Sequence, residues 1–241
     1  MTTMRACLQF VDELTFGRAA ASHIGRCARK TLAWRPAFRM ALSGGKSPLP
    51  AFHALTDPVI FPPPFWARTH IFLADERLGD PGHAHSNFRS IKEHLLDLVP
   101  IPAANMHPVP MRPDPESAAR EYSDILLQSF GGTPVFDLVV LGMGADGHTA
   151  SLFPHGPLLA HTPCTVAPVP APDLEPRLPR LTLTPLVLNA AREVLFLVLG
   201  QDKHAAVRAI LDGNRELPAA RVDARPQTWY VSPPLSAATT Q

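Results

Sequence analysis

The sequence is poor in cysteine and in charged residues, and each shortage narrows its possible functions. Its three cysteines, Cys7, Cys27 and Cys164, lie far apart and form no CxxC pair. We therefore expect three reduced thiols and no structural zinc site. Charged residues make up 18% of the chain and the formal net charge is only +1. This balance provides no electrostatic reason to expect nucleic acid as a partner.

Long apolar runs are also missing. No stretch approaches the roughly 20 apolar residues that a membrane-spanning helix needs, so we expect no membrane partner. The first ten residues are interrupted by Arg5 and Gln9 and lack the apolar core of a signal peptide. These two observations predict a cytoplasmic protein.

Proline is abundant, with 28 residues that cluster between the predicted elements, as in residues 61–64 and 168–179. Because proline fixes φ and removes a donor, we expect rigid loops there. Between the loops, short apolar runs alternate with segments of helical period. The predicted strands are residues 39–42, 69–73, 136–141 and 193–199, and the predicted helices are residues 14–30, 49–55, 87–99, 115–130 and 202–211. This alternation predicts an α/β fold, a Rossmann-like three-layer sandwich in which helices cover both faces of a mainly parallel sheet.

Glycine-rich or charged residues follow each predicted strand, at the edge where such sheets bind ligands. Ser43, Gly44, Gly45 and Lys46 follow the first strand and precede a helix. Glycine allows close backbone approach, and a helix start offers free N–H groups, so this turn is a candidate phosphate site. The alternative is an ordinary tight turn, since the Walker A pattern is absent.

The second predicted strand ends at Asp75, Glu76 and Arg77. Arg77 is suited to bidentate phosphate binding, with Asp75 or Glu76 orienting it or the sugar hydroxyls. The alternative is a surface salt-bridge cluster. Ser86 is equally well explained as the N-cap of the next helix.

The third predicted strand leads into Gly142-Met143-Gly144 and then to Asp146 and His148. Histidine is the side chain best suited to accept a proton near neutral pH. A carboxylate two residues away can fix the histidine tautomer, as the acid of a catalytic triad does. The competing interpretation is a loop histidine beside a helix cap formed by Asp146.

Two further cations border apolar elements. Lys203 lies near a helix start, where a cation opposes the helix dipole, and this favours an anion-binding role. Arg180 has a surface position as its alternative. His83 and His85 form a His-x-His pair, but no third ligand accompanies them, so we expect no metal site.

Taken together, these segments closely resemble the 6-phosphogluconolactonase family, within the larger group that includes glucosamine-6-phosphate deaminases. The resemblance covers residues 42–48, 72–77, 86–88, 136–154, 180–184 and 200–203, in family order. Residues 149–154, Thr-Ala-Ser-Leu-Phe-Pro, resemble the lactonase ending rather than the deaminase ending.

The resemblance implies a single domain over residues 1–241 that hydrolyses 6-phospho-D-glucono-1,5-lactone to 6-phospho-D-gluconate in the oxidative pentose phosphate pathway. It implies no metal and no organic cofactor, and we expect a monomer or a small homo-oligomer. By position, His148 would be the general base and Asp146 its partner. Arg77 would contact the phosphate, helped by the Ser43-Gly44-Gly45 turn, Arg180 and Lys203.

The sequence departs from the family pattern at two positions. Lys46 stands where serine or threonine is usual, and Ser232 stands where aspartate is common. Two alternatives remain beside the lactonase: a deaminase of the same fold, and a non-catalytic sugar-phosphate sensor. A sensor would need a DNA-binding module, for which the region before Ser43 is too short.

Overall fold

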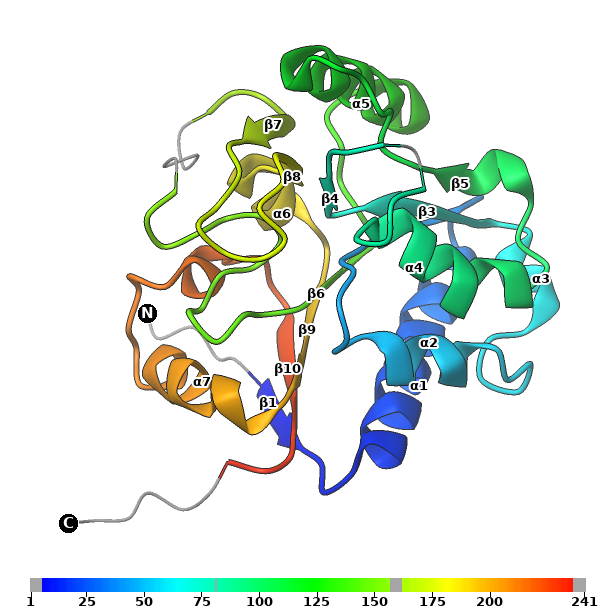
Figure 1. Cartoon of the computed structure of the whole chain (residues 1–241). Helices are drawn as coiled ribbons and strands as arrows, with labels where there is room; N and C mark the ends of the chain where they lie inside the picture. The colour runs from blue at the N-terminus through cyan, green and yellow to red at the C-terminus, as the bar shows by residue number, and fades with distance from the viewer. Residues whose placement is uncertain (1–5, 81, 157–161, 236–241) are drawn as a thin grey trace.

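The computed structural model describes residues 6–80, 82–156 and 162–235, and its centre is a seven-stranded parallel sheet (Figure 1). The strand order is β1-β10-β9-β6-β2-β3-β5, with every neighbouring pair parallel. Their bounds are β1 Ala6–Gln9, β2 Phe38–Leu42, β3 Thr69–Leu73, β5 Met106–His107, β6 Leu138–Leu141, β9 Val194–Leu199 and β10 Gln227–Ser232. The predicted parallel α/β fold is confirmed.

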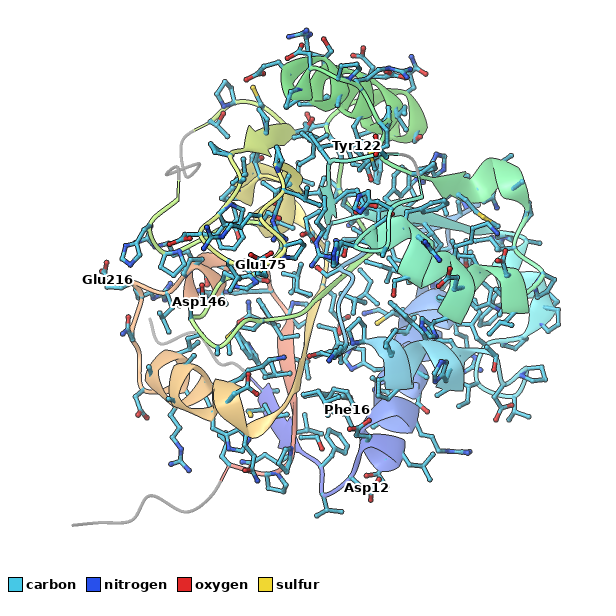
Figure 2. The ribbon with its side chains drawn as sticks, in the orientation of Figure 1. Asp12, Phe16, Tyr122, Asp146, Glu175 and Glu216 are labelled. Atoms are coloured by element: carbon cyan, nitrogen blue, oxygen red, sulfur yellow. The ribbon has the colours of Figure 1, made fainter. Side chains whose placement is uncertain are left out.

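Helices cover both faces of this sheet. Figure 1 shows α1 (Glu13–Leu32) and α2 (Leu49–Leu55) on one side of the strands and α7 (His204–Leu211) on the other. Phe16 lies on α1, is fully buried and points toward the sheet (Figure 2). The other helices are α3 Pro63–Trp66, α4 Asn87–His94, α5 Pro115–Phe130 and α6 Pro185–Ala190, with 3-10 turns at Leu96–Leu98, Ala103–Asn105, Gln201–Lys203 and Pro218–Arg221. Among the described helices, none combines the length and the apolar character needed to cross a membrane.

Side-chain bonds hold the helix ends and the helix packing. Asp12 caps α1 by accepting from the Thr15 N–H at 2.7 Å, as expected of an N-cap. Tyr122 on α5 is buried, and its hydroxyl pairs with the backbone N–H and carbonyl of Leu73 at the end of β3. This contact joins α5 to a strand end that borders the functional site described below.

A second, three-stranded sheet packs beyond the carboxyl end of the main one. Its order is β4-β8-β7, from β4 (Asp75–Arg77), β8 (Arg180–Leu183) and β7 (Val166–Val169), and both pairs are antiparallel. The expectation of a charged turn at residues 75–77 was therefore wrong. The chain leaves β3 through Ala74 and pairs again at once, because Ala74 O accepts from Leu183 N.

Other predicted boundaries of helices and loops also differ from those in the structure. The helix expected to reach residue 99 ends at His94, because Leu95 leaves helical geometry with φ −143°. Pro168 was expected in a rigid loop but lies inside β7, in the smaller sheet. The helix expected from residue 202 begins at His204, after a 3-10 turn.

Candidate active site

One cavity lies at the point in the sheet where the order of the strands reverses. From β2 the chain proceeds to β3 and β5, whereas from β6 on the other side of β2 it proceeds to β9 and β10. The segments that leave the carboxyl ends of β2 and β6 therefore diverge. Such a topological switch point is where open α/β sheets bind ligands.

This cavity encloses about 280 Å³ and is lined from all four predicted strand ends. Its walls carry four basic side chains, Lys46, Arg77, Arg180 and Lys203, against two acidic ones. A chain that is almost neutral overall thus concentrates positive charge in one hollow. The remaining lining residues are Ser43, Gly44, Gly45, Ser47, Asp75, Asn87, Gly142, Met143, Gly144, Ala145, His148, Ala150 and Asp202.

Two arginines 103 positions apart face each other across the smaller sheet. Arg77 on β4 pairs with Arg180 on β8 in the antiparallel register. Arg77 Nη1 donates to His85 O at 2.7 Å and Arg180 Nη2 donates to Pro176 O at 3.1 Å, but both Nε atoms are buried without a hydrogen-bond partner. Like charges directly opposite each other destabilise a sheet. An anion between the two guanidinium groups would compensate for this cost.

Burial reinforces the need for an anion. Arg180 is 3% exposed, and its burial, together with the neighbouring Arg77, lowers the pKa of its guanidinium. Burial likewise lowers the pKa of Lys203, whose ammonium donates to Ser47 Oγ at 3.0 Å. These cations are therefore held partly desolvated at the cavity wall, where an anionic ligand is attracted more strongly than in water.

The turn after β2 supplies neutral donors to the same wall. Ser43 Oγ is buried without a partner. In the described part of the chain, no hydrogen bond uses the backbone N–H of Gly44, Gly45 or Lys46. Gly45 has φ +84°, a conformation that side chains rarely adopt. Donors without partners beside a basic cavity are suited to phosphate oxygens.

The two acidic residues after β3 have separate surroundings. Asp75 lines the cavity and accepts from Ser151 Oγ at 2.9 Å. Glu76 is fully buried outside the lining and accepts from Ser86 Oγ and from the N–H groups of Asn87 and Phe88. Burial raises the pKa of Glu76, and these hydrogen bonds oppose the rise. Glu76 thus anchors the start of α4, whereas Asp75 is available to a ligand.

The loop after β6 presents His148 to the cavity. His148 Nδ1 pairs with Asp146 Oδ1 at 2.6 Å, and the same oxygen accepts from the His148 N–H at 3.1 Å. Asp146 is not part of the cavity wall and lies on the loop after β6 (Figure 2). Burial opposes ionisation of Asp146, but its bonds to His148 outweigh this effect and lower the pKa of Asp146. An ionised Asp146 fixes the proton on Nδ1 and leaves the Nε2 lone pair free for the cavity.

The helix-cap interpretation of this loop is wrong. No helix begins beside Asp146, so the residue is not a helix cap. Thr149 donates to Gly142 O and Ser151 donates to Asp75, so neither caps a helix. Phe153 lies beside both functional groups, with its ring 4.9 Å from the His148 ring and 5.5 Å from the Arg180 guanidinium carbon. The aromatic ring therefore links the histidine to the arginine pair.

Gly144 is required for the close approach of the His148 side chain. A Cβ at this position would lie 2.2 Å from His148 Cε1 and 2.7 Å from Asp146 Oδ1. We expect Gly144→Ala to displace the imidazole and to lower the kcat of any reaction that uses His148 as a base by about 10²-fold, the cost of a misplacement near 1 Å. Gly142→Ala also changes the cavity wall, but its Cβ would meet no atom within 4 Å, so this variant separates displacement of His148 from a simple change of the wall. Steady-state kinetics of both variants decide the matter, and equal kcat values would disprove the packing argument.

The structure brings together most of the residues singled out in the sequence. Ser43, Gly44, Gly45, Lys46, Asp75, Arg77, Arg180, Lys203 and His148 line the cavity, and Asp146 contacts it through His148. Asn87 and Asp202 are additional wall residues. Asp202 follows a strand end, which was the available signal, but a lone carboxylate there has many ordinary explanations.

Other singled-out residues lie elsewhere. His83 Nε2 pairs with Arg77 O at 3.0 Å, and neither His83 nor His85 belongs to a group of potential metal ligands among the described residues. Ser86 is the N-cap of α4 and donates to Glu76. Ser232 is buried at the end of β10, where its carbonyl accepts from Gly200 N.

Comparison with known proteins identifies relatives of this chain. Residues 12–231 match the family model described as glucosamine-6-phosphate isomerases/6-phosphogluconolactonase. The chain is 37% identical over 235 residues to a 6-phosphogluconolactonase of Homo sapiens, covering 92% of this chain and 89% of the relative. It is 42% identical over 186 residues to one from Synechocystis, covering 75% and 74%.

Solved structures share the fold. The crystal structure of a 6-phosphogluconolactonase from Thermotoga maritima superposes with a TM-score of 0.82 at 33% identity, covering 94% of this chain and 99% of that one. A monomeric glucosamine-6-phosphate deaminase has a TM-score of 0.80 at 17% identity, which shows the fold alone. The chain belongs to the glucosamine-6-phosphate isomerase/6-phosphogluconolactonase family.

Proposed function

We propose that this protein hydrolyses 6-phospho-D-glucono-1,5-lactone to 6-phospho-D-gluconate, the lactonase step of the oxidative pentose phosphate pathway. The observation that supports this most directly is one cavity that holds an oriented histidine together with two paired arginines, of which Arg180 is buried and Arg77 half-buried. A phosphorylated lactone has the matching pair of groups, an electrophilic carbonyl and a distant dianion. The relatives named 6-phosphogluconolactonase support the same assignment.

The proposed substrate orientation follows the charge of the walls. The phosphate lies against Arg77 and Arg180, with donors from the Ser43–Lys46 turn and the ammonium of Lys203 completing its contacts. Asp75 accepts from a sugar hydroxyl. Held in this way, the lactone carbonyl reaches the His148 side of the cavity, and its orientation lowers the barrier by several kcal/mol.

His148 then acts as general base. Its Nε2 takes a proton from water as the water oxygen attacks the lactone carbonyl carbon. The tetrahedral oxyanion is stabilised by backbone N–H groups or a cation of the wall, each good donor contributing about 3–4 kcal/mol. When the carbon–oxygen bond of the ring breaks, Nε2–H returns the proton to the leaving ring oxygen. Asp146 keeps the tautomer and balances the transient imidazolium charge.

The decisive assay follows the loss of freshly prepared 6-phosphogluconolactone with and without the protein. We expect the protein to accelerate loss far above the spontaneous rate, and to act much more weakly on the unphosphorylated lactone, which cannot use the arginine pair. A coupled ammonia assay with glucosamine 6-phosphate tests the deaminase alternative. Ammonia release without lactone hydrolysis would reverse the assignment, and inactivity in both assays would refute turnover of either substrate.

A further inference from the structure

A second cluster of reactive side chains lies away from the cavity, between α1 and the start of β9. His23, Cys27 and Glu193 each offer one ligand atom, and these atoms lie within 4.8 Å of one another. His23 Nε2 and Glu193 Oε1 are 2.6 Å apart, and Cys27 Sγ donates to Glu193 Oε2 at 3.4 Å. An imidazole, a thiol and a carboxylate at this spacing resemble a metal ligand set.

The fold assembles this cluster from two distant segments. His23 and Cys27 are four residues apart on α1, so they lie on one face of the helix. Glu193 directly precedes β9, and α1 packs against the neighbouring strand β10. Local sequence spacing shows only a His-x₃-Cys pair, which by itself falls short of the ligand count of a zinc site.

The cluster is well separated from the proposed active site. Glu193 lies at the amino end of β9, whereas the cavity lies beyond the carboxyl ends of the strands. A strand of six residues spans about 20 Å. The mechanism above uses none of these three side chains, so their convergence has no explanation in lactone hydrolysis.

The way the three side chains contact one another argues against a cysteine nucleophile. Glu193 accepts from both partners and lies between His23 and Cys27. The imidazole is therefore not placed to take the thiol proton, as it would be in a Cys–His dyad. A cation replacing the bridging protons would instead contact all three groups.

We propose that His23 Nε2, Cys27 Sγ and a Glu193 carboxylate oxygen bind Zn²⁺. Thiolate, imidazole and carboxylate ligands together suit this borderline-soft ion, with water as the fourth ligand. On binding, the Cys27 thiol releases its proton to solvent, and the proton between His23 Nε2 and Glu193 leaves Nε2 by exchange with solvent, so that the neutral imidazole keeps one proton, on Nδ1. A cavity of about 320 Å³ borders Cys27 and Glu193 and provides both an entry path and room for the water.

The histidine is already oriented for this role. His23 Nδ1 lies 3.2 Å from the hydroxyl of Tyr230, which is itself buried. With Nε2 on the ion, Nδ1–H donates to Tyr230, the outer contact that metal-bound histidines usually make. Bound Zn²⁺ would join α1 to the start of β9 and would stabilise the folded chain, which alone holds the three ligands together.

The test titrates the chelator-treated full chain with Co²⁺ and Zn²⁺. We expect Co²⁺ to produce a thiolate-to-cobalt charge-transfer band in the near ultraviolet and the strong visible bands of a four-coordinate ion. Zn²⁺ should abolish both sets of bands and raise Tm. No cysteine lines the active-site cavity, so ion binding at His148 would give no charge-transfer band.

The variants separate this site from other thiols. Cys27→Ala should remove the charge-transfer band, whereas Cys7→Ala, at the other half-buried thiol, should retain it. Tyr230→Phe should keep the band but weaken Zn²⁺ binding about 10- to 100-fold. Absence of the band in the unmodified chain, or its persistence in Cys27→Ala, would overturn the proposal. If Cys27→Ala does not fold, Glu193→Gln replaces it. Unchanged Zn²⁺ affinity in the Glu193→Gln variant would also overturn the proposal.

Discussion

His148→Ala is expected to lower kcat for the phosphorylated lactone by about 10²- to 10⁴-fold, the usual contribution of a general acid–base group. The fold should survive, because the His148 side chain is 22% exposed and its hydrogen bonds are confined to its own loop. Steady-state kinetics corrected for spontaneous hydrolysis measure the loss. Circular dichroism melting verifies that the variant is folded.

A matched control is available on the same loop. His155 is exposed and does not line the cavity, so His155→Ala should retain full turnover. Asp146→Asn should produce a smaller loss than His148→Ala, since the amide no longer favours the Nδ1–H tautomer or the imidazolium. Near-normal turnover in His148→Ala would eliminate this residue as the base.

Substitution of Arg77 or Arg180 should produce the second large effect, mainly as a rise in KM. A hydrogen bond to a charged group contributes about 1.5–3 kcal/mol. Arg77→Ala and Arg180→Ala are therefore each expected to raise KM for the phosphorylated lactone about 10- to 100-fold. The double variant should lose less than the product of the two single effects, because one dianion contacts both groups.

Three further measurements sharpen this test. Both substitutions should leave the slow hydrolysis of the unphosphorylated lactone almost unchanged, because that substrate has no phosphate for the arginines to bind. Thermal stability should not fall in proportion, since each substitution also relieves repulsion across the β4–β8 pair. Arg112→Ala, at an exposed ion pair with Glu121, is the control. An unchanged KM in Arg77→Ala would contradict its phosphate role.

The core of the fold was predictable because buried parallel strands are continuous apolar runs. The four strands predicted from the sequence are four consecutive interior strands of the observed sheet, β9, β6, β2 and β3. The missed strands β1 and β5 are short and lie at its edges, and β10 begins with the polar residues Gln227 and Thr228. Apolar periodicity is weak where a strand is short or has polar residues.

The smaller sheet escaped prediction for a different reason. Strand β4 consists of Asp75, Glu76 and Arg77, whose charges are typical of a turn. Its pairing with β8 depends on contacts about 100 residues apart in the chain, which local patterns do not encode. The same pairing places Arg77 opposite Arg180, so the arrangement of the proposed phosphate site was decided by the tertiary structure.

The sequence by itself determined which chemical groups lie together at the strand ends, because the carboxyl ends of all strands in a parallel sheet lie at the same edge. The Asp146–His148 pair was equally predictable, since two residues in one tight loop must lie close together. Tertiary structure alone decided that Glu76 is an internal anchor rather than a ligand, and that Glu193 meets a histidine and a cysteine of α1. These contacts depend on helix packing and strand register, which arise from the burial of the whole core rather than from any local motif.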